Sequence, residues 1–170
     1  LTVGRSTAGV IAVESSAATG RGLAHDRRFV VVDAAGRFLS QRELPLMATV
    51  WTDIAGGELR LAAPDHDEVA VPLEPAGGEP LVATVWESEC AAIAPSPEAD
   101  RWLSGVLGRP CRLAYMPEST RRLSNPRHAG PDRLVGFADG YAFLVVSEAS
   151  LAQLNARLGR PVPMDRFRAN

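Results

Sequence analysis

Phe29-Val30-Val31-Val32-Asp33-Ala34-Ala35-Gly36-Arg37-Phe38-Leu39-Ser40 carries the clearest structural signal in this chain. Its opening residues form an apolar, mostly β-branched run, which favours an extended strand. Asp33 to Gly36 have the residue types of a tight turn, and the residues from Arg37 to Ser40 can return beside the first run. The stretch therefore predicts a β-hairpin.

Short strands separated by turns are expected to continue beyond this hairpin. Leu59 and Leu61 alternate with charged residues, and Val69 and Val71 repeat the alternation, which is typical of half-buried strands. Two more strands are expected over residues 47–51 and 82–86, each near a Gly-Gly pair. Strands this short, with turns about every ten residues, favour a small antiparallel β-barrel over a βαβ sheet.

A helix is expected after these strands. Ser96-Pro97-Glu98 offers a hydroxyl cap, a proline at the first helical position and an acid in the first turn. Apolar residues then recur at helical spacing: Ala99, Trp102, Leu103, Val106 and Leu107. Gly108 and Pro110 should end this helix. One apolar stripe of the helix is therefore expected to face the core.

The rest of the chain should alternate between extended, irregular and helical structure. Strands are expected over residues 111–116 and 134–137, with a polar, mobile loop at 117–132 between them. Ser147 should cap a second helix whose Leu151, Leu154 and Leu158 share one face. The predicted fold class is α+β and predominantly β: a small antiparallel β-barrel followed by an αβ segment with two short helices. The predicted domains are the barrel at 1–95, an αβ linker subdomain at 96–162 that includes an arginine-containing loop at 117–132, and the first residues of a further domain at 163–170.

Composition places the chain among ordinary globular domains. Its 170 residues suit one domain, or one domain and the beginning of a second, and 46% of them are apolar. A net charge of −2 gives no general reason to expect binding to nucleic acid or to a membrane surface. No apolar run approaches the roughly 20 residues of a membrane-spanning helix. Leu1 to Arg5 lack both a secretory pattern and an initiator methionine, so we expect a cytoplasmic protein whose chain begins inside a longer gene product.

Cysteine and histidine spacing argues against a disulfide framework or a zinc centre. Cys90 and Cys111 are expected to be reduced core thiols, with a reactive thiol as the alternative. His25, His66 and His128 are scattered without ligand spacing and are expected on the surface or in loops. Walker, HExxH and Gly-x-Ser-x-Gly motifs are absent from the sequence. A self-sufficient hydrolase or zinc enzyme is therefore not expected.

Arginine carries the remaining functional signal. Arg27 and Arg28 lie at the entrance to the strand that begins at Phe29, while Arg5 is near the start of the chain and Arg168 near its end. The planar guanidinium binds phosphate through two parallel, charge-assisted hydrogen bonds. Position alone leaves two interpretations open, namely ordinary solvated charges at strand ends and groups that bind an anion.

Four segments of the chain resemble the MOSC family, and they occur in the family's order. Gly22-Leu23-Ala24-His25-Asp26-Arg27 is similar to the Gly-Leu-x-x-Asp-Arg segment of MOSC N-terminal β-barrel domains, and Phe38-Leu39-Ser40-Gln41-Arg42-Glu43 resembles the signature that follows. Phe137-Ala138-Asp139-Gly140 leads into Ser147-Glu148-Ala149-Ser150-Leu151, a junction found in the same proteins. Asp165-Arg166-Phe167-Arg168-Ala169-Asn170 resembles the Arg-Phe-Arg-Pro-Asn segment that opens the MOSC domain. The family includes the mitochondrial amidoxime-reducing component and bacterial YcbX-like proteins.

The resemblance implies a molybdenum pterin cofactor, enclosed in a basic cleft between the barrel and the MOSC domain. In such proteins the pterin dithiolene and a downstream protein cysteine hold the metal, and a soft thiolate suits molybdenum. Neither Cys90 nor Cys111 matches the position of that cysteine. The implied reaction is reduction of N-hydroxylated compounds. The implied partners are the downstream MOSC domain, an electron-donor redox protein and a small-molecule substrate.

The resemblance also assigns cofactor contacts to individual positions. The expected contact residues are Arg5, Ser6, Arg27, Asp139, Gly140, Arg168 and Asn170. Arg5 stands where the family has lysine, and Thr2-Val3-Gly4 replaces the usual aromatic-Pro-Val before it. Gly140 occupies a position that often holds a hydroxyl residue, and Ala169 replaces proline.

We expect this chain by itself to be catalytically inactive and to bind the cofactor weakly or not at all. Two alternatives stay open for the full protein. It could be a sulfur carrier or sulfurase associated with pyridoxal phosphate, although the chain contains no lysine to form the aldimine. It could instead be a recognition module that has lost the cofactor.

Overall fold

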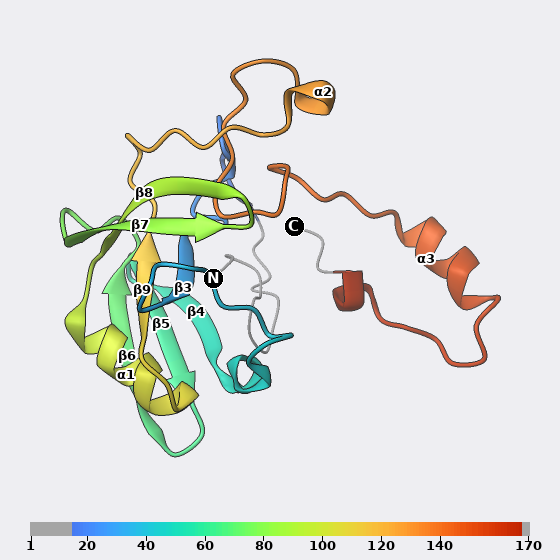
Figure 1. Ribbon diagram of the computed structural model, residues 1–170. Coiled ribbons are helices and arrows are strands. Elements are labelled where there is room, and N and C mark those ends of the chain that lie inside the picture. Colours follow the sequence, from blue (N-terminus) through green and yellow to red (C-terminus); the bar gives the residue numbers. More distant parts are fainter. Residues whose placement is uncertain (1–14, 168–170) are drawn as a thin grey trace.

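A computed structural model describes residues 15–167, except for the side chain of Asp165, and shows a predominantly β structure with short helices (Figure 1). The strands are β1 (Ala18–Thr19), β2 (Gly22–Leu23), β3 (Phe29–Asp33), β4 (Trp51–Ala55), β5 (Glu58–Ala63), β6 (His66–Pro72), β7 (Glu79–Val85), β8 (Ser88–Ala94) and β9 (Cys111–Tyr115). The helices are α1 (Pro97–Leu107), α2 (Pro126–Ala129) and α3 (Glu148–Asn155), with 3-10 turns η1 (Pro45–Thr49) and η2 (Met164–Phe167). The predicted class, α+β and predominantly β, is confirmed.

Hydrogen bonds close one sheet into a small barrel. Antiparallel pairing gives the order β3-β9-β8-β7, and the segment 36–38 then joins the two outer strands. Phe38 forms a bridge with Val32 of β3 on one side, while Arg37 forms a bridge with Thr84 of β7 on the other. The predicted hairpin of residues 29–40 is therefore confirmed, and its returning arm closes the barrel. β9, which follows α1 in the chain, lies between β3 and β8 in this sheet.

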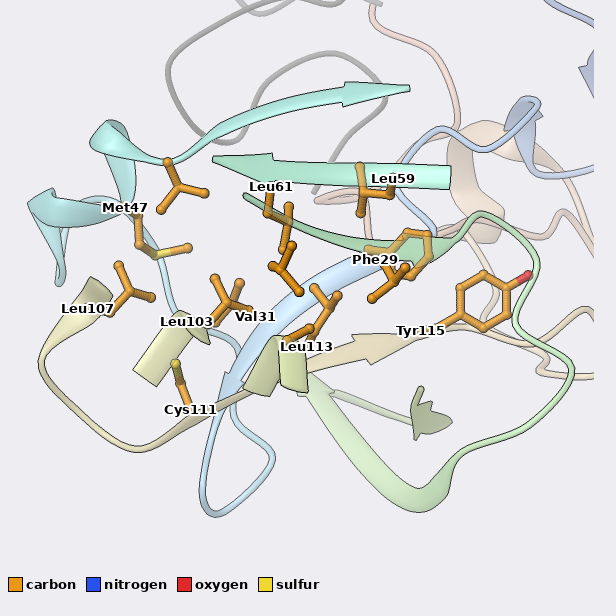
Figure 2. Packing of buried hydrophobic residues seen from close by; sticks show 14 of the residues in the cluster. Phe29, Val31, Met47, Leu59, Leu61, Leu103, Leu107, Cys111, Leu113 and Tyr115 are labelled. Atoms are coloured by element: carbon orange, nitrogen blue, oxygen red, sulfur yellow. The ribbon is translucent and has the colours of Figure 1, made fainter. Parts of the chain in front are cut away.

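β3 is buried on both faces and divides the core in two. Val30 and Val32 point into the barrel with Ala83, Val85 and Met116. Phe29 and Val31 point outward, where the second sheet, of order β4-β5-β6, and α1 cover them (Figure 2). A strand with apolar neighbours on both sides requires a continuous apolar run, and this is why Phe29 to Val32 show no polar alternation.

Local signals in the sequence account for α1. Ser96 accepts a hydrogen bond from the Ala99 backbone N–H, and Gly108 ends the helix with φ of 67° in the left-handed region. Ala99, Leu103 and Leu107 form the buried stripe. The predicted start, end and core-facing side of this helix are confirmed.

Several predicted strands differ in the structure. Residues 47–49 belong to η1, because Pro45 begins a 3-10 turn, and the strand starts only at Trp51. β8 was not predicted, although it pairs with β7 along its whole length. The strand expected at 134–137 is wrong, since this segment has a single bridge, between Leu134 and Leu123. The backbone N–H groups of Val135 and Phe137 instead donate to the carbonyl oxygens of Arg122 and Arg27, and the Arg122 side chain donates to the Gly136 carbonyl oxygen.

That loop, residues 117–132, was expected to be polar and mobile, but it is anchored to the barrel. Thr120, Arg122 and Ser124 are buried, and the short helix α2 begins after Asn125, whose side chain accepts from the backbone N–H of Arg127. Burial of alternate residues from 120 to 124 shows that one side of the loop packs against the protein. Composition did not reveal this, because polar residues that bond to backbone can be buried.

The second predicted helix is present as α3, with Ser147 accepting from the Ser150 backbone N–H. It ends at Asn155, so Leu158 lies outside it. No residue of α3 is buried, and the helix lies away from the sheets (Figure 1). None of the helices in the described part of the chain has the length and apolar character needed to cross a membrane.

Candidate functional site

A cavity of 660 Å³ lies beside the barrel between β3, the segment 38–42, the β7–β8 turn and the segment 137–144. This volume is within the usual range for small-molecule sites. Among the residues that the structure describes, two arginines line it, Arg27 and Arg42. Aromatic side chains form much of the remaining wall: Phe29, Phe38, Trp86, Phe137, Tyr141, Phe143 and Phe167. The cavity can therefore hold a planar group and neutralise a negative charge on it.

Arg27 is placed at the cavity by an unusual backbone. Its φ is 51°, in the left-handed region, and it precedes β3 by two residues. Its Nη1 donates to Oδ2 of the buried Asp26 at 2.5 Å, and 18% of its side chain stays exposed. Asp26 thus fixes the guanidinium in one orientation while leaving part of it open to the cavity.

The backbone of Arg27 also holds the adjacent segment of the cavity wall, at Gly136 and Phe137. The Arg27 carbonyl oxygen accepts a 2.7 Å hydrogen bond from the backbone N–H of Phe137. A side chain at Gly136 would bring its Cβ to 2.6 Å from the same carbonyl oxygen. Glycine is required there because the two backbones lie too close for a methyl group.

Arg122 fixes the same wall from inside the protein. Its Nη1 donates to the carbonyl oxygens of Gly136 and Ala138, each at 2.6 Å, and only 6% of the residue is exposed. Burial lowers the pKa of Arg122, while Cys90 and Asp139 act in the opposite direction. Two backbone carbonyl oxygens hold this guanidinium. Among the described residues, no carboxylate lies within ion-pair distance of it. Arg122 therefore positions residues 136–138 and does not line the cavity.

Asp139 and Gly140 follow directly on this positioned segment. Oδ1 of Asp139 accepts a hydrogen bond from the indole Nε1 of Trp86 at 3.1 Å. Nothing lies within 4 Å of the Cβ position at Gly140, so a hydroxyl residue would fit there. The aspartate thus links the β7–β8 turn to the wall of the cavity.

Two other arginines near Arg27 have structural contacts. Arg28 donates to the Met116 carbonyl oxygen at 2.6 Å and to Oε2 of Glu118 at 2.8 Å. Arg21 is 5% exposed and donates to the carbonyl oxygens of Glu118 and Thr120. Both arginines thus bind the segment 116–120, which follows β9, and neither lines the cavity.

The structure brings three of the predicted contact residues together, since Arg27, Asp139 and Gly140 all line the cavity. Arg5, Ser6, Arg168 and Asn170 lie outside the described residues. Whether any of them contacts a cofactor stays a prediction. Sequence reasoning missed Trp86 and Arg122, because their roles depend on partners far away in the chain.

The cysteines and histidines lie apart from the cavity wall. Cys90 and Cys111 are free and buried, as predicted, and burial raises the pKa of both thiols. His66 and His128 are exposed. Within residues 15–167, no cluster of three or more histidine, cysteine or acidic side chains could hold a metal ion.

Comparison with known proteins places the chain in a family. The sequence profile of the MOSC N-terminal beta barrel domain matches residues 5–110, which is more than half of the chain. This chain belongs to the MOSC family. The profile of the MOSC domain matches residues 132–170 of the same MOSC chain, so the cavity lies where the two matched segments meet. The domain divisions predicted at residues 95 and 162 stay predictions.

Two groups of relatives are similar to this MOSC chain. Mitochondrial amidoxime-reducing component 1 of Mus musculus is 28% identical over 169 residues, covering 94% of this chain and 50% of the relative. Molybdenum cofactor sulfurase of Arabidopsis thaliana is 28% identical over 149 residues, covering 81% of this chain and 18% of the relative. The MOSC chain thus spans half or less of these relatives. A solution structure of a Bordetella bronchiseptica protein is also similar, with a TM-score of 0.52, 25% identity, and coverage of 61% of this chain and 82% of that one.

Proposed function

We propose that this MOSC chain forms one wall of a molybdenum pterin cofactor site in an oxidoreductase that reduces N-hydroxylated compounds. The observation that carries the proposal is the position of Arg27, which lines the cavity, has a partly exposed side chain and is oriented by the buried carboxylate of Asp26. Arg27 would bind the pterin phosphate through charge-assisted hydrogen bonds. Arg5, Ser6, Arg168 and Asn170 are proposed as further contacts from the two ends of the chain.

The residues present fit the pterin part of such a cofactor. A cation, aromatic walls and the 660 Å³ volume suit a planar group that bears a phosphate. Asp139 and Gly140 would offer backbone polar groups, because Arg122 and Arg27 hold the segment that leads to them.

These residues do not supply a ligand for the metal. Cys90 and Cys111 are buried, and neither is among the residues that line the cavity. We therefore propose that a cysteine outside these 170 residues binds molybdenum, in a more complete MOSC domain. The chain alone is then expected to be inactive.

The proposed reaction is a two-electron reduction. The N–O bond of the substrate breaks, and its oxygen leaves as water after uptake of two electrons and two protons. The bound cofactor supplies the redox chemistry, and a partner redox protein supplies the electrons. What this chain's own residues do is bind and orient: Arg27 holds the anionic end of the cofactor, and the aromatic wall excludes water. The predicted compartment is the cytoplasm, whose reducing conditions suit two free thiols.

The relationship to sulfurases supports a second candidate. Amidoxime-reducing and sulfurase relatives match this chain with the same 28% identity, so relatedness does not separate them. In this alternative the full protein transfers sulfur and is associated with pyridoxal phosphate. An aldimine absorbance band in the full protein, together with the absence of amidoxime reduction, would favour it.

Metal analysis tests the main proposal. The chain and a longer form that continues through a complete MOSC domain would be expressed in a host that makes the cofactor, and molybdenum content and pterin fluorescence would be measured. We expect about one metal and one pterin per molecule in the longer form and little of either in the chain alone. Neither metal nor pterin in either form would overturn the proposal in favour of a recognition module without a cofactor.

Substitution of Arg27 gives the residue-level test. In the longer form, Arg27→Ala should lower cofactor affinity roughly tenfold, which corresponds to loss of one charge-assisted hydrogen bond of about 1.5 kcal/mol. Arg101→Ala is the matched control, because Arg101 is an exposed arginine of α1. Equal cofactor occupancy in the two variants, with both folded by circular dichroism, would remove Arg27 from the site.

A further inference from the structure

Trp86 has a backbone conformation that its side chain does not favour. It is the first residue of the two-residue β7–β8 turn, in which Val85 pairs with Ser88, and its φ is 55°. Hairpin turns with a positive φ at this position favour glycine, because a side chain there crowds the backbone. A bulky residue held in this region is rare, and such outliers gather at binding sites.

Two contacts hold the indole ring in place. Its Nε1 donates to Oδ1 of Asp139 at 3.1 Å, and its ring packs edge-on against Phe38, with centroids 4.8 Å apart. The residue nevertheless stays 53% exposed and lines the cavity. A large aromatic surface is therefore fixed in orientation and left uncovered.

We propose that the Trp86 indole is a stacking surface for a planar aromatic ring bound in this cavity. The inference rests on the proposed function in that it concerns the same cavity, and it names the class of ligand that the wall would select. A flat conjugated ring should bind a fixed, half-exposed indole more favourably than a puckered aliphatic ring does, because stacking needs two parallel faces. Tyr141 and Phe143 add further aromatic residues to the lining of the same cavity.

The ring could belong to an aromatic substrate or to the pterin of the cofactor, and the same chemistry serves both. As a substrate wall, Trp86 would favour aromatic over aliphatic N-hydroxylated compounds. As a cofactor wall, it would act together with Arg27, which would bind the phosphate of the same molecule.

Tryptophan N–H signals in NMR spectra provide the test. The isotope-labelled 170-residue chain has three tryptophans, and their indole signals would be assigned with Trp86→Phe and Trp51→Phe. Three probes would be titrated: a phenyl amidoxime, its cyclohexyl counterpart and a free pterin. Trp51 is the matched internal control, because it is 49% exposed but does not line the cavity.

We expect a planar probe to shift the Trp86 indole signal and not that of Trp51. A preference of at least about fivefold for phenyl over cyclohexyl amidoxime would indicate that Trp86 stacks on a substrate ring. A shift caused by pterin alone would indicate that it stacks on the cofactor. Trp86→Leu should abolish binding of the planar probe, and Trp51→Leu should leave this binding unchanged. Trp86→Gly offers a second variant that suits the turn, should Trp86→Leu unfold the hairpin.

Equal affinity for phenyl and cyclohexyl probes with no pterin binding, or equal shifts of Trp86 and Trp51, would overturn the inference. This outcome is separate from failure of the proposed function, since the titration needs no metal. If the chain binds planar rings at Trp86 but the longer form contains no molybdenum, the inference about Trp86 stands and the proposed cofactor is excluded.

Discussion

The backbone N–H of Phe137 donates a 2.7 Å hydrogen bond to the carbonyl oxygen of Arg27. This bond joins the segment that matches the MOSC N-terminal barrel to the segment that matches the MOSC domain. Arg27 and Phe137 both line the cavity, and the Arg27 carbonyl oxygen fixes the position of Phe137. Arg27 thus supplies the proposed binding group with its side chain and, with its carbonyl oxygen, a hydrogen bond that fixes the cavity wall.

Gly136→Ala should weaken this junction. Its new Cβ would lie 2.6 Å from the Arg27 carbonyl oxygen, and relief of this overlap requires the backbones to separate. We expect a loss of about 1–3 kcal/mol in the free energy of unfolding, measured by urea denaturation. Gly140→Ala is the control, because nothing lies within 4 Å of its Cβ position. Equal stability of the two variants would show that the close approach is not maintained in solution.

Arg122→Ala should also destabilise the wall. It removes the donor for two buried carbonyl oxygens, those of Gly136 and Ala138, and leaves both without this bond. The expected loss is about 2–3 kcal/mol. Arg121→Ala should change stability by less than about 0.5 kcal/mol, because the Arg121 side chain is 66% exposed and its pair with Asp132 is on the surface. Comparable effects of the two substitutions would contradict the role assigned to Arg122.

Gly36→Ala tests the closure of the barrel. Gly36 has φ of 84°, and a Cβ there would lie 2.2 Å from the carbonyl oxygen of Val82 on β7. The substitution should lower the unfolding free energy by at least about 2 kcal/mol, since both backbone strain and overlap oppose it. Gly77→Ala, with open space around its Cβ position, should be nearly neutral. A well-folded Gly36→Ala protein of unchanged thermal midpoint would mean that segment 36–38 does not close the sheet.

Stability should fall at alkaline pH because of the buried thiols. Burial raises the pKa of Cys90 and Cys111, so the folded protein keeps these protons when the unfolded chain begins to lose them. Their contribution is therefore complete below the ordinary thiol pKa of about 8.5, and it is lost as pH rises from there toward the raised values. Urea midpoints measured from about pH 7 to pH 10 should decline above about 8.5.

The double variant Cys90→Ala, Cys111→Ala should show a shallower decline. Some alkaline loss should persist, because burial also raises the pKa of Tyr115. An identical slope in the wild type and the double variant would exclude the thiols as the cause. Slow reaction of both cysteines with a thiol reagent before unfolding, and fast reaction after it, would provide an independent check.

Much of the fold was predictable because its signals are local. The apolar run from Phe29 to Val32 with the turn after it, and the cap and stripe of α1, act over a few residues and were confirmed. The same holds for the burial of both cysteines. η1 was missed because Pro45 begins a turn within a run that also fits a strand. The 117–132 loop was misjudged, since a polar residue such as Arg122 can be buried when backbone carbonyls satisfy it.

The sequence by itself determined the family, the predominantly β class and the identity of Arg27 as a candidate, since all three depend on residue types at fixed spacing. Tertiary structure alone decided which of two adjacent arginines lines the cavity: Arg27 does, while Arg28 next to it donates to the Met116 carbonyl oxygen. It also decided that Trp86 bonds to Asp139. The physical reason is that these contacts join segments distant in the chain, so they exist only after the barrel has closed and brought its turns beside residues 136–140.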